Sequence, residues 1–359
     1  MKEIRNIIDQ YDSIDHSTEK VALASVVNVE ESSYRRIGAR MLVRSSGIWT
    51  GGISGGCLEG DALKRSLKAI FNNTPSRVVY DTMEDDNNQI GVGLGCNGKI
   101  EVLFTPIDPS DPHNEIEVLR SIQDTEEPQI LIKAIESEEH LGKNLLIHPD
   151  LSNEGFCEIS STDLAHCIRE VSALRKPKIY TFDNSQSTEK ILVEFLRPET
   201  KLIIVGDNYD IRAMTAIASE LGWDCTVVGK AKKLSKEVFK KVSTVVDYAD
   251  AHQLTIHDYT AVILMSHDYN HDKNLLPFFL SKQPTYLGLL GPKKRYDKMK
   301  IELGIQDSSV ACLYTPTGLE IGAESPEEIA LSIAAEIVAA FRNKKGGFLR
   351  EKEGTIHDR

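Results

Sequence analysis

One stretch decides the fold of this chain: KLIIVGDNYDIRAMTAIASELGWDCTVVG, residues 201–229. It opens with an apolar run typical of a buried strand, turns at Gly206, continues with apolar residues at a helical period and closes with a second apolar run. Strand, turn, helix and strand make a βαβ unit, from which parallel sheets are built. The stretch therefore predicts that a nucleotide-type fold begins near residue 201.

The same alternation continues toward the C-terminus. Further apolar strand patterns, separated by helical ones, are found at residues 244–246, 261–266, 285–290 and 311–314. Strands that alternate with helices predict a Rossmann-like, doubly wound parallel sheet over residues 199–345. A last helix is expected from Pro326 to about Phe341, because Ser325 and Glu328 have the spacing of a capping box. A charged tail, residues 346–359, follows.

The first half of the chain predicts a mixed α/β domain over residues 1–198. We expect a strand at residues 21–29, a hairpin at 39–50, a helix at 58–71 and two further strands at 77–81 and 99–105. Residues 107–198 carry mixed strand and helix patterns without a catalytic motif, and we expect them to complete and cover the sheet of this domain. The predicted fold class is α/β throughout.

Composition narrows the function classes. The chain has 359 residues, 41% of them hydrophobic, and a net charge of -12, which argues against a nucleic-acid-binding protein. Its N-terminus lacks the apolar core of a signal peptide, and no run approaches the roughly 18 apolar residues that span a bilayer. Six cysteines occur without a CxxC pair, so neither a disulfide framework nor a zinc site is indicated. We expect a cytoplasmic protein.

Two cysteines are set in glycine-rich loops. Cys57 ends the run GGISGGC, where Gly55 and Gly56 precede an expected helix, and Cys96 stands beside Gly95 and Asn97 in GVGLGCNG. A helix N-terminus and permissive backbone favour a thiolate that ligates a soft metal, carries a persulfide or attacks a substrate. The alternative is a small buried residue in a tight turn. Two such loops in one domain favour a shared site.

The segment SSYRRIGAR, residues 32–40, places hydroxyl and guanidinium groups in one loop. Ser33, Arg36 and Arg40 are candidates for binding a phosphate or another anion. An ordinary solvated turn is the alternative.

The second domain offers an anion site at its strand ends. Gly206, His267 and Gly291 each follow an expected strand, and Lys293 and Arg295 begin the helix after the last of them. A solvated helix start is the alternative for these two cations. The NAD fingerprint fails, because GxGxxG would need glycine where Asn208 and Ile211 stand and an acid where Gly229 stands. A metal site at His267 and His271 is not favoured, since Asp272 is read as a helix cap.

Taken together, these motifs resemble the xanthine dehydrogenase accessory proteins, the family that includes the accessory factor of carbon monoxide dehydrogenase. The similar segments are ESSYRRIGARM, GGISGGCLEGD, GLGCNG, MSHDYNHD, GLLGPKKR and TGLEIGAESPEEIALSIAAEI, in this order. They cover nearly the whole chain outside residues 107–198.

The resemblance implies a protein that binds molybdenum cofactor (molybdopterin), assists its sulfuration with a cysteine desulfurase and delivers it to an apo-hydroxylase. It implies Cys57 and Cys96 as catalytic residues or molybdenum ligands and Arg36 and Arg40 as partners of the anionic cofactor. Such a protein is a maturation factor or chaperone rather than a turnover enzyme. The alternative is an NAD(P)-dependent oxidoreductase with a redox-active cysteine. The apolar face of the helix after Pro326 and the glycine-rich surface of the first domain predict a homodimer.

Overall fold

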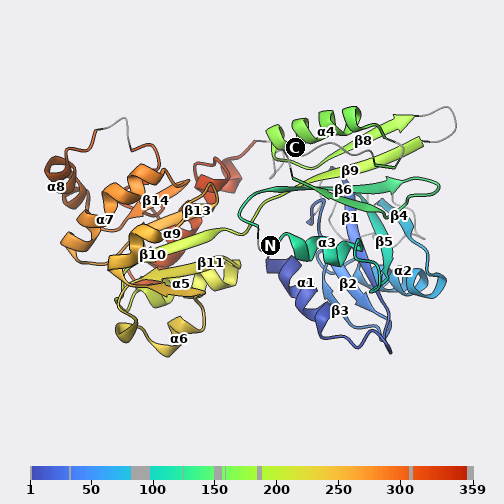
Figure 1. Cartoon of the computed structure of the whole chain (residues 1–359), viewed down its shortest axis with the longest axis horizontal. Coiled ribbons are helices and arrows are strands. Elements are labelled where there is room, and N and C mark those ends of the chain that lie inside the picture. The colour runs from blue at the N-terminus through green and yellow to red at the C-terminus, as the bar shows by residue number, and fades with distance from the viewer. Residues whose placement is uncertain are drawn as a thin grey trace. The chain divides into compact units, whose positions relative to one another are not determined.

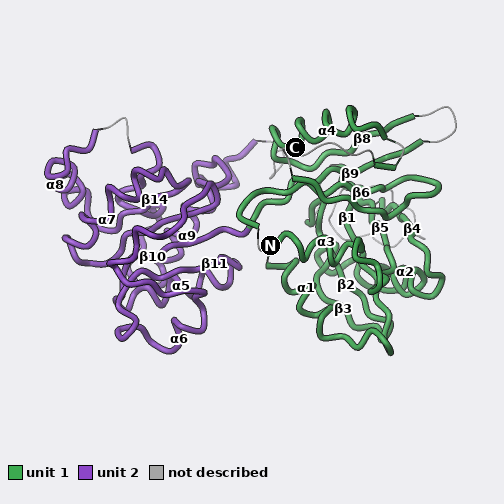
Figure 2. Tube along the Cα trace, in the orientation of Figure 1, with its two compact units in different colours: residues 1–198 green, residues 199–359 purple. Residues whose placement is uncertain are grey.

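The protein is described by a computed structural model, and its chain divides into two compact units, unit 1 (residues 1–198) and unit 2 (residues 199–359), coloured separately in Figure 2. The residues described are 2–31, 34–81, 98–123, 125–148, 156–157, 159–183, 188–306 and 310–353. Four residues singled out from the sequence, Ser33, Gly95, Cys96 and Asn97, lie outside this description.

Unit 1 contains a five-stranded antiparallel sheet of order β3-β2-β1-β5-β4. Its strands are β1 (Val21–Glu31), β2 (Arg40–Arg44), β3 (Trp49–Gly51), β4 (Ser76–Asp81) and β5 (Gly98–Ile107). The predicted hairpin is formed by β2 and β3, which turn at Gly47 with φ +89°, a value that favours glycine. The helices of this part are α1 (Lys2–Asp12) and α2 (Glu59–Asn72).

The expectation that residues 107–198 complete that sheet is wrong, whereas they do cover one of its faces. They form a second antiparallel sheet of four strands, in the order β7-β6-β9-β8. The elements are α3 (Glu115–Ser121), β6 (Gln129–Glu136), β7 (Asn144–Ile147), α4 (Ser161–Leu174), β8 (Lys178–Asp183) and β9 (Thr188–Leu196). The strand β9, whose residues the sequence patterns did not single out, is the central partner of β6 and β8.

The two sheets of unit 1 pack against each other through apolar side chains. Val27 and Leu103 of the first sheet form one buried cluster with Ile135 and Leu192 of the second. The helix α2 packs on the first sheet, and α4 covers the second one (Figure 1). Each sheet buries both of its faces within unit 1. The two sheets therefore pack as separate layers and do not join edge to edge.

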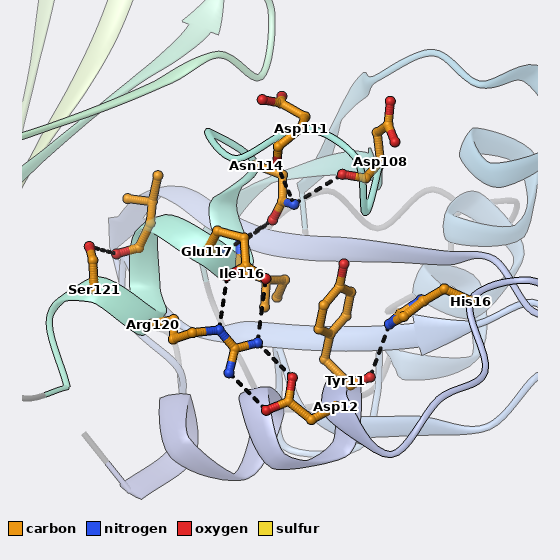
Figure 3. A network of polar contacts seen from close by, with 11 residues as sticks. Tyr11, Asp12, His16, Asp108, Asp111, Asn114, Ile116, Glu117, Arg120 and Ser121 are labelled. Carbon is orange, nitrogen blue, oxygen red and sulfur yellow. Dashed lines mark hydrogen bonds and ion pairs between the residues drawn. The ribbon is translucent and has the colours of Figure 1, made fainter.

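The helices α1 and α3 are joined by polar contacts (Figure 3). The guanidinium of Arg120 donates to both carboxylate oxygens of Asp12 at 2.8 and 2.6 Å and to Glu117 at 2.9 Å. The side chain of Asn114 caps α3 by accepting from the N–H groups of Ile116 and Glu117. This network positions α3, whose first residue, Glu115, points into the core.

Unit 2 is a parallel sheet of order β12-β11-β10-β13-β14-β15 with helices on both faces, and the predicted fold class is confirmed. Its elements are β10 (Lys201–Val205), α5 (Ile211–Leu221), β11 (Asp224–Val228), η1 (Ala231–Lys233), α6 (Lys236–Phe239), β12 (Thr244–Val246), η2 (Tyr248–Gln253), β13 (Thr260–Leu264), α7 (Tyr269–Lys282), β14 (Tyr286–Leu289), α8 (Lys293–Leu303), β15 (Leu313–Tyr314), α9 (Pro326–Phe341) and η4 (Leu349–Glu351).

The central strand β10 is apolar from Leu202 to Val205 and is buried on both faces over these residues. Leu202 and Ile204 point into a core shared with α5, α6 and α9, and Ile203 and Val205 point into a core shared with α7 and α8. Figure 1 shows these two helix layers on either side of the sheet. The carboxyl ends of the strands therefore meet at one edge, where such folds hold their ligands.

Candidate functional site

The loop that carries Cys57 connects β3 to α2 and is held by hydrogen bonds. The hydroxyl of Ser54 accepts from the N–H groups of Gly56 at 3.2 Å and Leu58 at 3.0 Å, and the Ser54 N–H donates to the Glu59 carboxylate at 2.8 Å. Burial alone would raise the pKa of Glu59, but the hydrogen bonds from Ser54 outweigh it and lower that pKa. Cys57, an unpaired thiol that is partly exposed, therefore stands on a fixed loop.

The helix α2 begins at Glu59, two residues after Cys57. Its N-cap residue, Leu58, makes no side-chain cap, and the first turn carries the carboxylates of Glu59 and Asp61. These carboxylates offset the partial positive charge of the helix N-terminus. The exposure of the thiol, rather than the helix dipole, is the feature that makes Cys57 available.

Two segments that the sequence singled out lie together at one end of the first sheet, the SSYRRIGAR segment from Tyr34 onward and the glycine loop of Cys57. The ring of Tyr34 lies against Gly55, where an added Cβ would be 3.5 Å from the ring. Gly98, two residues after Cys96, pairs with Glu31 at the end of β1, just before the SSYRRIGAR segment. Arg36 is exposed in that segment. The structure thus brings the described part of the SSYRRIGAR segment against the loop of Cys57; we call this end of unit 1 the thiol end.

Arg40 is not at the surface. Its side chain is 2% exposed and donates to Glu115 at 2.8 Å and to Glu194 at 2.9 Å. The ammonium of Lys133 lies 2.5 Å from Glu115 in the same cluster. Because its donors are occupied by carboxylates between the two sheets, we leave Arg40 out of the cofactor site.

In unit 2, the structure places Gly206, His267 and Gly291 after three neighbouring strands, β10, β13 and β14. The imidazole Nε2 of His267 lies 2.5 Å from a carboxylate oxygen of Asp210. The backbone of His267 has φ +58°, a left-handed value that is uncommon outside glycine. The sequence analysis did not single out Asp210. Its position at the N-cap of α5, beside the carboxyl ends of the strands, could have identified it as a candidate.

The cations after β14 have different surroundings. Lys293 is exposed, whereas Arg295 donates to the buried carboxylate of Asp272 at 2.6 Å. Asp272 also accepts from the Ser266 hydroxyl at 2.6 Å. Burial raises the pKa of Asp272, while Ser266 and Arg295 counteract that rise. Removing Arg295 would leave a buried carboxylate without its cation, so Arg295 supports the edge of the sheet besides any role toward a ligand.

His267 and His271 do not form a metal site in the described part of the chain. Asp268 caps α7 by accepting from the N–H of His271 at 3.1 Å, and the His271 ring stacks on Tyr248 with centroids 4.0 Å apart. Over the residues with described positions, no group of three or more His, Cys, Asp or Glu side chains is arranged to hold a metal ion.

The turn after β10 explains why the NAD fingerprint is missing. Asp207 is buried and accepts from the Lys230 N–H at 3.1 Å and the Lys233 ammonium at 2.9 Å. A Cβ on Gly229 would lie 2.8 Å from the Cβ of Asp207. Asn208 donates to the Ser266 carbonyl at 2.5 Å. Asp207 therefore fills space beside the residue where NAD enzymes place the acid that binds ribose.

Among the described residues, no helix is both long and apolar enough to span a bilayer.

Comparisons with known proteins agree along the chain. Residues 202–337 match the family model described as the XdhC Rossmann domain, and residues 15–81 match the one described as the XdhC and CoxI family. A Bacillus subtilis (strain 168) protein, named as a probable subunit of xanthine dehydrogenase, is 29% identical over 337 residues, which are 93% of this chain and 97% of that protein. The Escherichia coli (strain K12) molybdenum cofactor insertion chaperone PaoD is 22% identical over 88% of this chain and 82% of its own.

A crystal structure described as a xanthine dehydrogenase from Bacillus halodurans has a TM-score of 0.70 and 25% sequence identity. The similarity covers 94% of this chain and 96% of that one. The likeness therefore extends over both units.

Proposed function

This chain belongs to the XdhC and CoxI family, and from that premise we propose that it is a maturation factor for a molybdenum enzyme. In this proposal it binds molybdenum cofactor, holds it during sulfuration by a cysteine desulfurase and inserts it into an apo-hydroxylase of the xanthine dehydrogenase type. The names of two relatives, a molybdenum cofactor insertion chaperone and a probable xanthine dehydrogenase subunit, support it. The cofactor is cargo here, so the protein acts as a carrier.

The observation that carries the proposal is the thiol end of unit 1. A partly exposed cysteine, Cys57, stands on a hydrogen-bonded glycine loop, next to a segment with the exposed guanidinium of Arg36. Molybdenum cofactor is a phosphate-bearing pterin dithiolene, and it calls for soft sulfur together with amide and guanidinium donors. This donor set fits that chemistry. A reducing cytoplasm, where we place the protein, keeps the thiol available.

An NAD(P)-dependent oxidoreductase is disfavoured by the turn after β10. The side chain of Asn208 occupies the place where backbone should approach a pyrophosphate, and the buried Asp207 fills the space beside Gly229, where the ribose-binding acid should stand. We therefore propose no hydride chemistry for unit 2.

The test compares cysteine variants of the full chain. Cys57→Ser and Cys96→Ser are incubated with molybdenum cofactor, separated from unbound cofactor by gel filtration, and assayed for bound pterin and for activation of apo-hydroxylase. We expect each substitution to lower retention at least about tenfold, as the loss of a ligand bond would. Cys157→Ser, another partly exposed cysteine of unit 1, is the matched control. Retention and activation by Cys57→Ser equal to those of the parent would refute the role of this thiol.

A further inference from the structure

A lysine-rich segment follows β11 in unit 2. Residues 230–241, KAKKLSKEVFKK, contain six lysines and one acid in a chain whose net charge is -12. All six lysine side chains are exposed. The cofactor handling proposed for the thiol end of unit 1 does not account for this local excess of positive charge on an acidic protein.

The segment borders a pocket. A cavity of about 630 Å³ lies between the turn after β10, the segment around α6 and the first turn of α9, elements that share one face of the sheet (Figure 1). Residues from these three places line it, among them Asn208, Tyr209, Arg212, Lys233, Lys236 and Pro326. The volume lies within the range of roughly 300 to 1,000 Å³ typical of small-molecule sites.

The cations of the pocket differ in how they are paired. Lys233 contacts Asp207 at 2.9 Å, and Arg212 lies 3.5 Å from Glu237, both pairs with an exposed cation. Lys236 makes no ion pair with any residue that the structure describes. The Arg212–Glu237 pair is exposed on both sides and contributes little, whereas Lys233 neutralises the buried carboxylate of Asp207 and stays with it. Lys236 and Arg212 are therefore the cations available to a ligand.

An aromatic side chain stands beside these cations. The side chain of Tyr209 is 81% exposed on the turn after β10, within the pocket lining. A solvent-exposed tyrosine at a binding pocket provides a flat surface on which a heteroaromatic ring can stack. In a Rossmann unit the residues after the second strand face the ribose, and cations at that place suit a phosphate where an acid would suit a hydroxyl.

We propose that this pocket, the lysine pocket, binds a phosphomonoester carried on a flat heteroaromatic ring, that is, a mononucleotide. Lys236 and Arg212 hold the doubly charged phosphate, and Tyr209 stacks on the ring. The proposal goes beyond cofactor handling by Cys57 and does not depend on it.

Calorimetric titrations of the full chain test the site with adenosine monophosphate, adenosine and inorganic phosphate as probes. We expect micromolar affinity for the monophosphate and at least about tenfold weaker binding of each fragment, because each lacks one of the two contacts. Lys236→Glu should weaken the monophosphate about tenfold or more, and Tyr209→Ala should weaken the monophosphate without changing the affinity for inorganic phosphate. Both side chains are exposed, so these variants should keep the thermal unfolding midpoint of the parent.

Lys240→Glu is the matched control, because it makes the same charge change in the same segment outside the pocket lining. An equal loss in Lys236→Glu and Lys240→Glu, or no binding tighter than millimolar for any ring-borne monophosphate, would overturn the proposal. Metal-free molybdopterin is titrated alongside, and tighter binding of it than of adenosine monophosphate would also overturn the proposal. Cys57→Ser should leave these affinities unchanged, so failure of the lysine pocket and failure of the proposed function are separate results.

Discussion

Arg40 lies in a buried cluster of charged side chains between the two sheets of unit 1. It contacts Glu115 and Glu194, and Lys133 contacts Glu115, so two cations face two carboxylates away from water. Burying a charge without a partner is expensive, whereas a balanced and hydrogen-bonded cluster is tolerated. The cluster links β2, α3, β6 and β9, and thereby fixes which faces of the sheets meet.

Removing one cation of the cluster should therefore destabilise the fold. We expect Arg40→Met to lower the free energy of unfolding by roughly 3 to 5 kcal/mol, because two buried carboxylates would be left with one cation. Urea unfolding followed by circular dichroism measures the change. Arg44→Met, which removes a partly exposed ion pair with Glu19 from the same strand, should lower the free energy of unfolding by only about 1 kcal/mol or less. Equal effects of the two substitutions would contradict this account.

The same cluster should make the stability of the fold depend on pH under acidic conditions. Burial alone would raise the pKa of Glu115, but Lys133 and Arg40 outweigh it and lower the pKa from 4.5 to about 2. A carboxyl whose pKa is lower in the folded state stabilises the fold above its unfolded-state pKa and loses that contribution as the pH falls through its folded-state pKa. The contribution, on the order of 3 kcal/mol, should disappear between about pH 4.5 and pH 2.

Urea unfolding at a series of pH values measures this loss. Between pH 5 and pH 2 the stability of the parent should fall more steeply than that of Glu115→Gln, which cannot titrate at this position. Parallel curves for the two proteins would show that another carboxyl governs acid unfolding.

At the scale of elements, the crossover from β10 to β11 decides what unit 2 binds. The buried carboxylate of Asp207 holds the start of the lysine-rich segment through the Lys230 N–H and the Lys233 ammonium. Gly229 has no room for a side chain, because Asp207 lies beside it. The carboxylate of Asp207 thus holds the start of the lysine-rich segment in place and does not face a ribose.

Placing an acid at position 229, where NAD enzymes carry the acid that binds ribose, should therefore not create an NAD site. We expect Gly229→Asp to lower stability by about 1 to 3 kcal/mol through overpacking and to give no micromolar affinity for NAD. Thermal unfolding and calorimetric titration measure the two effects. In the double variant with Asp207→Gly, the packing penalty should be smaller because the contact at 2.8 Å with Asp207 is gone, while the one at 3.0 Å with the Gly206 carbonyl oxygen remains. Micromolar NAD binding by the parent or by Gly229→Asp alone would revive the oxidoreductase alternative.

At the scale of the whole molecule, α9 has an apolar surface that its own unit does not cover. Ile333 and Ile337 are buried in the core, whereas Leu331 is 55% exposed and Ala335 and Val338 are partly exposed. Capped at its start by Ser325 and Glu328, the helix is well formed up to Phe341. Its uncovered stripe is the feature of the described residues that favours self-association.

We accordingly predict a homodimer that uses α9. Light scattering at micromolar concentration should give about twice the chain mass of 40.0 kDa, and Leu331→Glu should shift the protein to monomer by placing a charge in the contact. Glu327→Lys, a charge change at an exposed position in the first turn of the same helix, is the control and should remain dimeric. A monomer at all micromolar concentrations would exclude this assembly.

Local sequence determined the elements of unit 2 and their order, because apolar runs at strand and helix periods reflect burial on one or two faces of a sheet. It likewise determined the cap of α9 and the placement of Cys57 in a glycine loop before α2. It also indicated family membership through several motifs in order, which the comparisons confirm.

Only the tertiary structure decided which residues meet. The burial of Arg40 between two sheets, the second sheet formed by residues 107–198, the contact of Tyr34 with Gly55 and the conflict between Asp207 and Gly229 all join residues distant in sequence. A pattern of hydrophobicity fixes how a segment folds on itself, but an arginine in a strand looks the same whether its partner is water, a ligand or a glutamate from another sheet. Packing makes that choice, because each buried charge must find its partner where the long-range contacts place one.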